Sequence, residues 1–145
     1  MSEFPPMADL VPHGPPMLML EELVSWAPGE AECRMTVRDD APFVEEGRVD
    51  AVLTMEYMAQ CVAACLGYEA FREGVGVRVG MIVAVRQMAL AVPHIAAGTT
   101  LRVLAKRIRG NDVLSHFDTE VRAADGDAVL ATATMTLVHA EKPPE

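Results

Sequence analysis

The amino-acid sequence predicts an α+β fold in which an antiparallel sheet wraps around one long central helix. Three observations carry this prediction. Two short strand-like segments come first, one long apolar segment of helical character follows, and four strand-like segments joined mainly by hairpin turns close the chain. The 145 residues are 51% hydrophobic and 23% charged, which is enough for one domain with its own core. We therefore expect residues 1–145 to form a single domain.

The first third of the chain predicts an arm, two strands and a loop. Five prolines lie within residues 1–16, which indicates an irregular N-terminal arm. Residues 17–26 fit a strand, or a short helix followed by a strand. Residues 30–37 alternate well enough for a second strand, and residues 38–48 form a polar loop.

The long helix is predicted over residues 50–72, with Asp50 as its N-cap. Placed on a period of 3.6 residues, its apolar side chains occur on every side. A helix of this kind is expected to be buried all round. Ala63, Ala64 and Gly67 are small, so we expect another segment to pack closely against them.

The remaining strands are separated by turn signals at Gly110-Asn-Asp112 and Asp125-Gly126. Alternation over residues 113–123, the third of these strands, places Val113, Phe117 and Val121 on its inward side. Residues 140–145 are expected to be a flexible tail. The four strands are predicted at residues 80–92, 99–109, 113–123 and 128–139.

One sheet curled around one helix is the hotdog arrangement. A single unit of this kind leaves the edges of the sheet unpaired and one end of the helix exposed. We therefore expect the protein to be dimeric.

Glu56 is the most informative residue of the predicted helix, because the segment around it is almost wholly uncharged. An ionised carboxylate is not removed from water cheaply, so such a residue is paired, protonated or functional. Gln60 lies one turn further along on the same face. The alternative is a purely structural role, in which Glu56 is a buried glutamate whose carboxyl accepts a hydrogen bond from Gln60 or from a backbone N–H.

Charge and composition exclude several classes of function. A formal net charge of −9 argues against a nucleic-acid or anionic-membrane surface. We expect no metal, no cofactor and no membrane span, and we expect the protein in the cytoplasm. The three cysteines, Cys33, Cys61 and Cys65, fit buried thiols better than a zinc site. One cluster of basic residues could dock an acidic carrier protein, although a solvated strand face is the simpler interpretation; its members are Arg102, Lys106, Arg107 and Arg109.

Several motifs resemble those of bacterial 3-hydroxyacyl-thioester dehydratases of the FabZ type. Leu10-Val-Pro-His-Gly-Pro-Pro-Met-Leu-Met-Leu20 resembles the family's opening Leu-Pro-His-Arg-x-Pro-x-Leu-Leu. Pro42-Phe43 and Met55-Glu-Tyr-Met-Ala-Gln60 resemble its His-Phe-Pro-Gly loop and its Glu-Ala-x-Ala-Gln helix. Leu90-Ala-Val-Pro-His-Ile-Ala-Ala-Gly98 resembles a later strand and turn. The similarity extends from Leu10 to Val138.

This resemblance implies dehydration of a 3-hydroxyacyl group carried on acyl carrier protein or on coenzyme A. In the family a histidine removes the C2 proton, and a helix carboxyl from the opposite protomer protonates the leaving hydroxyl. Glu56 falls on the position of that acid, and Gln60 on the glutamine that follows it. His13 is a second candidate, although the family keeps this histidine beside the catalytic one. Substrate contacts are implied for Phe43 and for the backbone N–H groups of Ala51 and Val52 at the helix start.

The chain departs from the family pattern at its most important position. The catalytic histidine lies fourteen residues before the glutamate, and Pro42 stands there in this chain. The loop is more similar to the ApeP-type relatives, which act with a second hotdog subunit. Three interpretations follow: one subunit of a heterodimeric dehydratase, a thioesterase using Glu56 as base, or a non-catalytic module that binds acyl chains or carriers. A homodimer and a heterodimer both stay possible.

Overall fold

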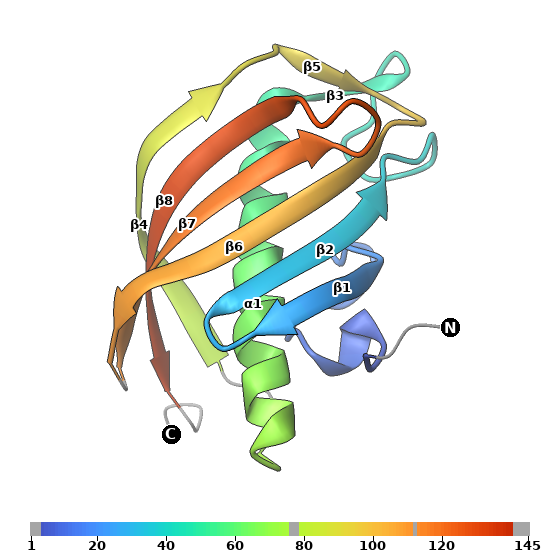
Figure 1. The fold of residues 1–145 in the computed structure, drawn as a ribbon. Helices are drawn as coiled ribbons and strands as arrows, with labels where there is room; N and C mark the ends of the chain where they lie inside the picture. The colour runs from blue at the N-terminus through green and yellow to red at the C-terminus, as the bar shows by residue number, and fades with distance from the viewer. Residues whose placement is uncertain (1–3, 76–78, 112, 141–145) are drawn as a thin grey trace.

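The computed structural model describes residues 4–75, 79–111 and 113–140, and it has the predicted sheet wrapped around one helix (Figure 1). The tail was predicted over residues 140–145, but Ala140 is the last residue of a strand; residues 141–145 lie outside the described residues. The six main strands form one antiparallel sheet in the order β1-β2-β6-β7-β8-β4. Their bounds are β1 (Glu22–Ala27), β2 (Glu30–Thr36), β4 (Val79–Leu90), β6 (Thr100–Gly110), β7 (Leu114–Ala123) and β8 (Val129–Ala140).

Two short strands were not predicted. β3 (Arg48–Asp50) and β5 (His94–Ala96) pair antiparallel in a separate two-stranded ladder. From the sequence alone, the first is expected at the junction of loop and helix and the second in a turn. Each strand has three residues, which is too short to show an alternation, and each forms only because the other lies beside it.

The helix begins with a 3₁₀ turn, η2 (Ala51–Leu53), and continues as α1 (Thr54–Arg72). Asp50 caps this start, because its Oδ1 accepts a hydrogen bond of 2.9 Å from the N–H of Val52. The predicted start and end of the helix are both confirmed.

The inward face of the sheet packs on α1 to form the core. Phe117 and Val121 on β7 are fully buried, as their alternation predicts. Val113 is 59% exposed, so its predicted inward placement is wrong. β7 begins one residue later, and Val113 lies in the preceding turn, where its N–H donates to Oδ1 of Asn111.

The N-terminal arm crosses α1 at Gly67. Residues Met7–Asp9 form a short 3₁₀ helix, η1, and Leu10 after it is fully buried. A Cβ added to Gly67 would lie 1.7 Å from the carbonyl oxygen of Leu10. The close packing predicted for this part of the helix is therefore confirmed at Gly67, and the segment that packs there is the arm.

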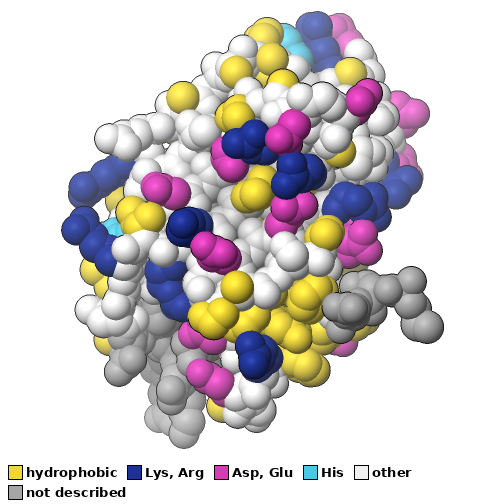
Figure 2. Space-filling view, in the orientation of Figure 1, with side chains coloured by type: hydrophobic (Ala, Val, Ile, Leu, Met, Phe, Trp, Pro, Cys, Tyr) yellow, Lys and Arg dark blue, Asp and Glu magenta, His cyan; other side chains and the backbone are white. Residues whose placement is uncertain are grey.

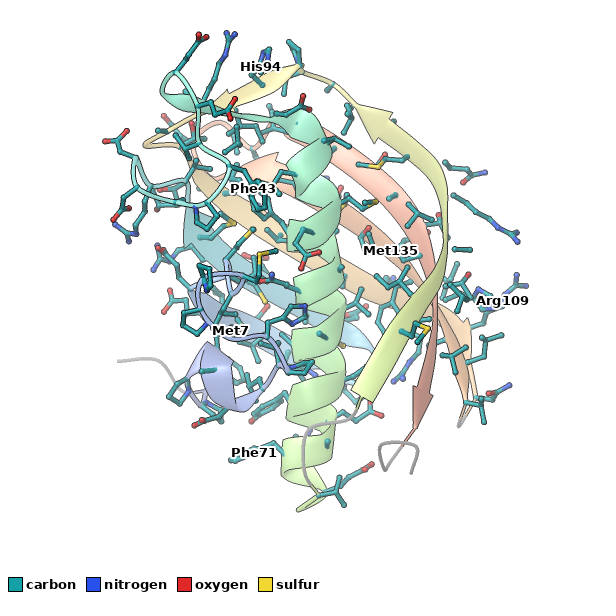
Figure 3. The ribbon with its side chains drawn as sticks, turned by 180° about the vertical axis from the view of Figure 1, so that it is seen from behind. Met7, Phe43, Phe71, His94, Arg109 and Met135 are labelled. Atoms are coloured by element: carbon teal, nitrogen blue, oxygen red, sulfur yellow. The ribbon has the colours of Figure 1, made fainter. Side chains whose placement is uncertain are left out.

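α1 is not buried all round within one chain, which corrects the sequence-based expectation. Along one side five residues are left wholly or partly exposed. Val52 is 52% exposed and Met55 40%, and the other three are partly buried. In Figure 3 the arm lies on one side of α1 and β4 on the other. We call this side of the helix the open stripe; its residues are Val52, Met55, Glu56, Ala59 and Ala63.

β4 is an edge strand of the sheet and exposes apolar side chains. Met81 is 68% exposed and Val83 54%. A long apolar edge strand beside an apolar helix stripe is typical of a surface that another chain covers.

Candidate active site

Glu56 lies on the open stripe, in the first turn of α1, and its side chain is 32% exposed. It is the only charged residue of that stripe. Its Oε1 accepts a hydrogen bond of 3.0 Å from Nε2 of Gln60, one turn further along. The carboxyl group is therefore held by its own helix and still reaches the surface.

Gln60 is fully buried, and it ties the helix to the arm. Its Nε2 also donates to the carbonyl oxygen of Met17 at 2.6 Å. Its Oε1 accepts from the backbone N–H groups of Met19 at 2.9 Å and Leu20 at 3.3 Å. Both donor hydrogens and both acceptor positions of the amide are thus used. This arrangement fixes the orientation of Gln60 and, through it, that of Glu56.

His13 comes to the same place from the arm. Its Nε2 lies 3.4 Å from Oε1 of Glu56, and its side chain is 27% exposed. Its Nδ1 is buried and has no hydrogen-bond partner within the described chain. The structure therefore brings His13 to Glu56 and Gln60, a proximity that the separation of His13 from the helix in the sequence does not indicate.

The two backbone N–H groups expected near a substrate carbonyl already have acceptors inside the chain. The N–H of Ala51 donates to the carbonyl oxygen of Pro93 at 3.0 Å, and that of Val52 donates to the Asp50 carboxylate. Asp50 was predicted as the helix cap. The prediction did not recognise that this cap occupies the N–H of Val52, which was expected to bind the substrate carbonyl. The FabZ-type pattern opens this helix with Pro-Gly where the present chain has Asp50-Ala51, and that difference is the signal that could have shown it.

Phe43 lies in the loop before β3, and its side chain is 59% exposed. Figure 3 views the molecule from the side of α1 and shows Phe43 beside the N-terminal half of the helix. Pro42 precedes it, so this chain presents no imidazole at that position. His94 is exposed on β5 and lies near the outer end of the molecule.

Three of the four residues of the predicted basic cluster are ion-paired within the chain. Arg102 binds Glu32 at 2.8 Å and also contacts Asp127. Lys106 lies 3.6 Å from Glu30, and Arg107 turns inward to Glu69 at 2.8 Å. On the outer face of the sheet, charges of both signs are interspersed (Figure 2). The simpler interpretation, a solvated strand face, therefore fits better than carrier docking.

A groove of about 750 Å³ crosses this outer face, on the opposite side of the sheet from α1. Of its charged lining residues, Glu30, Glu32, Lys106 and Glu120 form ion pairs within the chain. Asp118 accepts a hydrogen bond of 3.1 Å from Thr134. It holds no part of the Glu56 group and is not a candidate for the same chemistry.

Other reactive side chains are buried in the core. The three cysteines are free thiols with no exposed surface, and burial raises the pKa of Cys65 to about 12. Burial also raises the pKa of Tyr57, beside Glu56 in sequence, to about 12. In the described parts of the chain, no group of three or more His, Cys, Asp or Glu residues is placed to hold a metal ion. Among the same residues, no helix has the length and apolarity that a membrane crossing requires.

The family model described as "ApeP dehydratase", of the ApeP-like family, matches residues 5–145. The chain belongs to the ApeP-like dehydratase family. It is thus a dehydratase-like hotdog protein, in agreement with the resemblance inferred from its motifs. No curated protein sequence matches this chain.

Solved structures share the fold of this ApeP-like chain. The dehydratase heterocomplex ApeI:P from Xenorhabdus doucetiae matches with a TM-score of 0.89 and 22% identity, over 99% of this chain and 94% of that one. Zebrafish thioesterase superfamily member 2 matches with a TM-score of 0.68 and 18% identity, over 91% and 89%. The TT0310 protein from Thermus thermophilus matches with a TM-score of 0.61 and 19% identity, over 81% and 89%. At these identities the structures show the fold alone.

Proposed function

We propose that this chain takes part in the dehydration of 3-hydroxyacyl thioesters in the cytoplasm, and that a second hotdog subunit completes its site. The observation that carries this proposal is the position of Glu56. It is a carboxyl group held by Gln60 on an apolar stripe that the chain itself leaves uncovered. A group at such a place meets both the partner and the substrate.

Dehydration needs one group that removes the C2 proton and another that protonates the leaving hydroxyl at C3. Glu56 is proposed as the acid, with Gln60 as the residue that orients it. His13 is proposed as part of the same proton network, because its Nε2 is 3.4 Å from the Glu56 carboxyl. The base is proposed to come from a histidine of the companion subunit, since Pro42 replaces the corresponding residue here.

Substrate contacts are proposed for Phe43 and Val52; Ala51 supports the start of the helix instead, because its N–H donates to the carbonyl oxygen of Pro93. Phe43 would form one wall of the entrance beside α1. The N–H of Val52 can polarise a thioester carbonyl only after the Asp50 carboxylate turns away from it. The thioester carrier is proposed to be acyl carrier protein or coenzyme A; both are anionic. Because the described basic cluster is largely ion-paired within this chain, the companion is the better docking surface for either carrier.

The test compares the chain alone, a companion hotdog protein encoded beside it, and the mixture, using 3-hydroxyacyl thioesters and following enoyl formation. We expect no dehydration by the chain alone and dehydration by the mixture. Glu56→Gln should lower the activity of the mixture by about 10²-fold or more, since general acids contribute that much, while the complex still forms on gel filtration. Glu45→Gln, an exposed carboxylate of the preceding loop, is the matched control and should have no effect.

Two other outcomes would contradict this function. If the chain alone releases free thiol from acyl thioesters and loses this activity in Glu56→Gln, it is a thioesterase. If the mixture dehydrates equally well with Glu56→Gln, this subunit is a non-catalytic partner or binding module.

A further inference from the structure

Phe43 has a backbone conformation that its side chain does not favour. Its φ is +69°, in the left-handed region that glycine or asparagine normally occupies. A bulky aromatic residue is strained there, and the ring is also 59% exposed. Glycine at this position would relieve the strain. The aromatic ring is therefore present despite a positive φ and despite its exposure to solvent.

The surrounding loop holds this conformation in place. The N–H of Ala41 donates to the carbonyl oxygen of Arg38 at 3.0 Å, and that of Val44 donates to the carbonyl oxygen of Ala41 at 3.3 Å. Further along, Glu45 and Arg48 exchange backbone hydrogen bonds of 2.9 and 3.2 Å. Val44 packs against the core, whereas Phe43 does not. The loop therefore projects the Phe43 ring outward from a fixed backbone.

Other exposed apolar side chains belong to the same side of the molecule. Figure 3 shows Phe43 beside the start of the helix, where Val52 of η2 is 52% and Met55 of α1 is 40% exposed. Met17, whose carbonyl oxygen binds Gln60, is 40% exposed on the arm. Phe43 thus adds a large exposed ring to the apolar side chains on this side of the molecule.

We propose that Phe43 is an anchor that inserts into the companion hotdog subunit across the open stripe. This inference rests on the proposed function, which places that subunit there. A residue on a backbone that is already fixed loses little backbone entropy on binding, and aromatic residues are enriched at protein interfaces. In the proposed function the base that acts with Glu56 is a histidine of the companion, so the occupant of this face is a protein rather than an acyl chain alone.

The test measures the dissociation constant between this chain and the companion hotdog protein, without substrate, together with the melting temperature of each variant alone. Phe43→Gly should weaken the complex at least tenfold, because the anchor is lost. The melting temperature of the isolated chain should be unchanged or slightly raised, because the positive φ no longer strains the backbone. Phe43→Leu, which keeps apolar bulk, should recover part of the affinity.

Glu46→Gly is the matched control. Glu46 lies in the same loop and also has a positive φ, +55°, but it offers no apolar group. It should leave the dissociation constant unchanged. An equal loss of affinity in Glu46→Gly would mean that loop rigidity matters and not the ring, and this would overturn the proposal.

Three further results would overturn it. The first is a loss of less than tenfold in Phe43→Gly. The second is a clear fall in the melting temperature of the isolated variant, which would make Phe43 a folding residue. The third is a Phe43→Gly variant that binds the companion as the wild type does. Its only change would then be weaker self-association or an altered KM for the thioester. A wild-type complex that forms but does not dehydrate would contradict the proposed function and leave the anchor standing.

Discussion

Gly67 is the residue through which the arm reaches the candidate site. The arm crosses α1 there, and the carbonyl oxygen of Leu10 occupies the space of a side chain. From this crossing the arm continues to His13 and then to the three backbone groups that bind Gln60. The position of His13 beside Glu56 therefore depends on a missing methyl group further along the helix.

Gly67→Ala should destabilise the protein although alanine favours helices. The added methyl would overlap the Leu10 carbonyl, and overpacking of this kind costs about 1–3 kcal/mol, more than the gain of up to about 1 kcal/mol in helix propensity. Urea unfolding followed by circular dichroism measures the difference. Gly14→Ala, where nothing lies within 4 Å, should change stability little. Equal stability of Gly67→Ala and the wild type would show that the arm moves freely at this crossing.

Gln60 illustrates why one residue can be both structural and functional. Its amide satisfies two backbone N–H groups and one carbonyl of the arm before it reaches Glu56. A buried amide with every position used is expensive to replace, because its partners would be left without hydrogen bonds. Gln60 is therefore a core residue with all its hydrogen bonds made, as a purely structural role requires. It also holds the proposed acid, Glu56.

At the scale of elements, the two edges of the sheet differ in what they expose. β1 has six residues and a register shift between Leu23 and Ser25. β4 has twelve residues, and its first half exposes Met81 and Val83. Together with the open stripe of α1, β4 offers the larger apolar surface to a second hotdog protomer.

Val83→Lys should therefore weaken association with a second hotdog protomer at least tenfold. A lysine at a paired strand edge puts a charge into an apolar contact. The side chain is 54% exposed in the single chain, so folding should be little affected. Sedimentation velocity over a range of concentrations measures the change. Val24→Lys, on the opposite edge strand at 45% exposure, is the control. Association that resists Val83→Lys but is lost in Val24→Lys would place the contact at β1 instead.

At the scale of the whole molecule, the interior contains groups that must stay protonated. Burial raises the pKa of Cys65 and of Tyr57 to about 12, and that of Cys61 well above its usual value. In the unfolded chain the thiols lose their protons from about pH 9 and the phenol from about pH 10. The folded state therefore binds more protons than the unfolded state in this range.

The stability that these groups provide is fully present below pH 9 and is lost as the pH rises towards 12. We expect the free energy of unfolding to fall by on the order of 7 kcal/mol across this window, about 4 kcal/mol from Cys65 and about 3 kcal/mol from Tyr57, measured by urea titration at a series of pH values. Cys65→Ala should reduce the slope, most clearly between pH 9 and 10, where the unfolded-state thiols titrate. An unchanged slope in that variant would show that Cys65 is not the group responsible.

Much of this protein is determined by local sequence. The period and capping of residues 50–72 predict α1, because Asp50 and a long run without proline specify a helix wherever it packs. The hairpin signals and the alternation around Phe117 and Val121 predict the sheet for the same local reason. Glu56 and Gln60 could be chosen from the sequence, since a carboxyl group in an apolar helix needs an explanation.

Tertiary structure decided what depends on contacts distant in sequence. Only the folded chain brings His13 to Glu56, pairs β3 with β5, and fills the space at Gly67 with the Leu10 carbonyl. It also decided which side of α1 stays exposed, because burial depends on what the arm and the sheet cover and not on the helix period. The strained, outward conformation of Phe43 has the same origin: a loop closed by its own hydrogen bonds sets a backbone angle that the residue itself does not prefer.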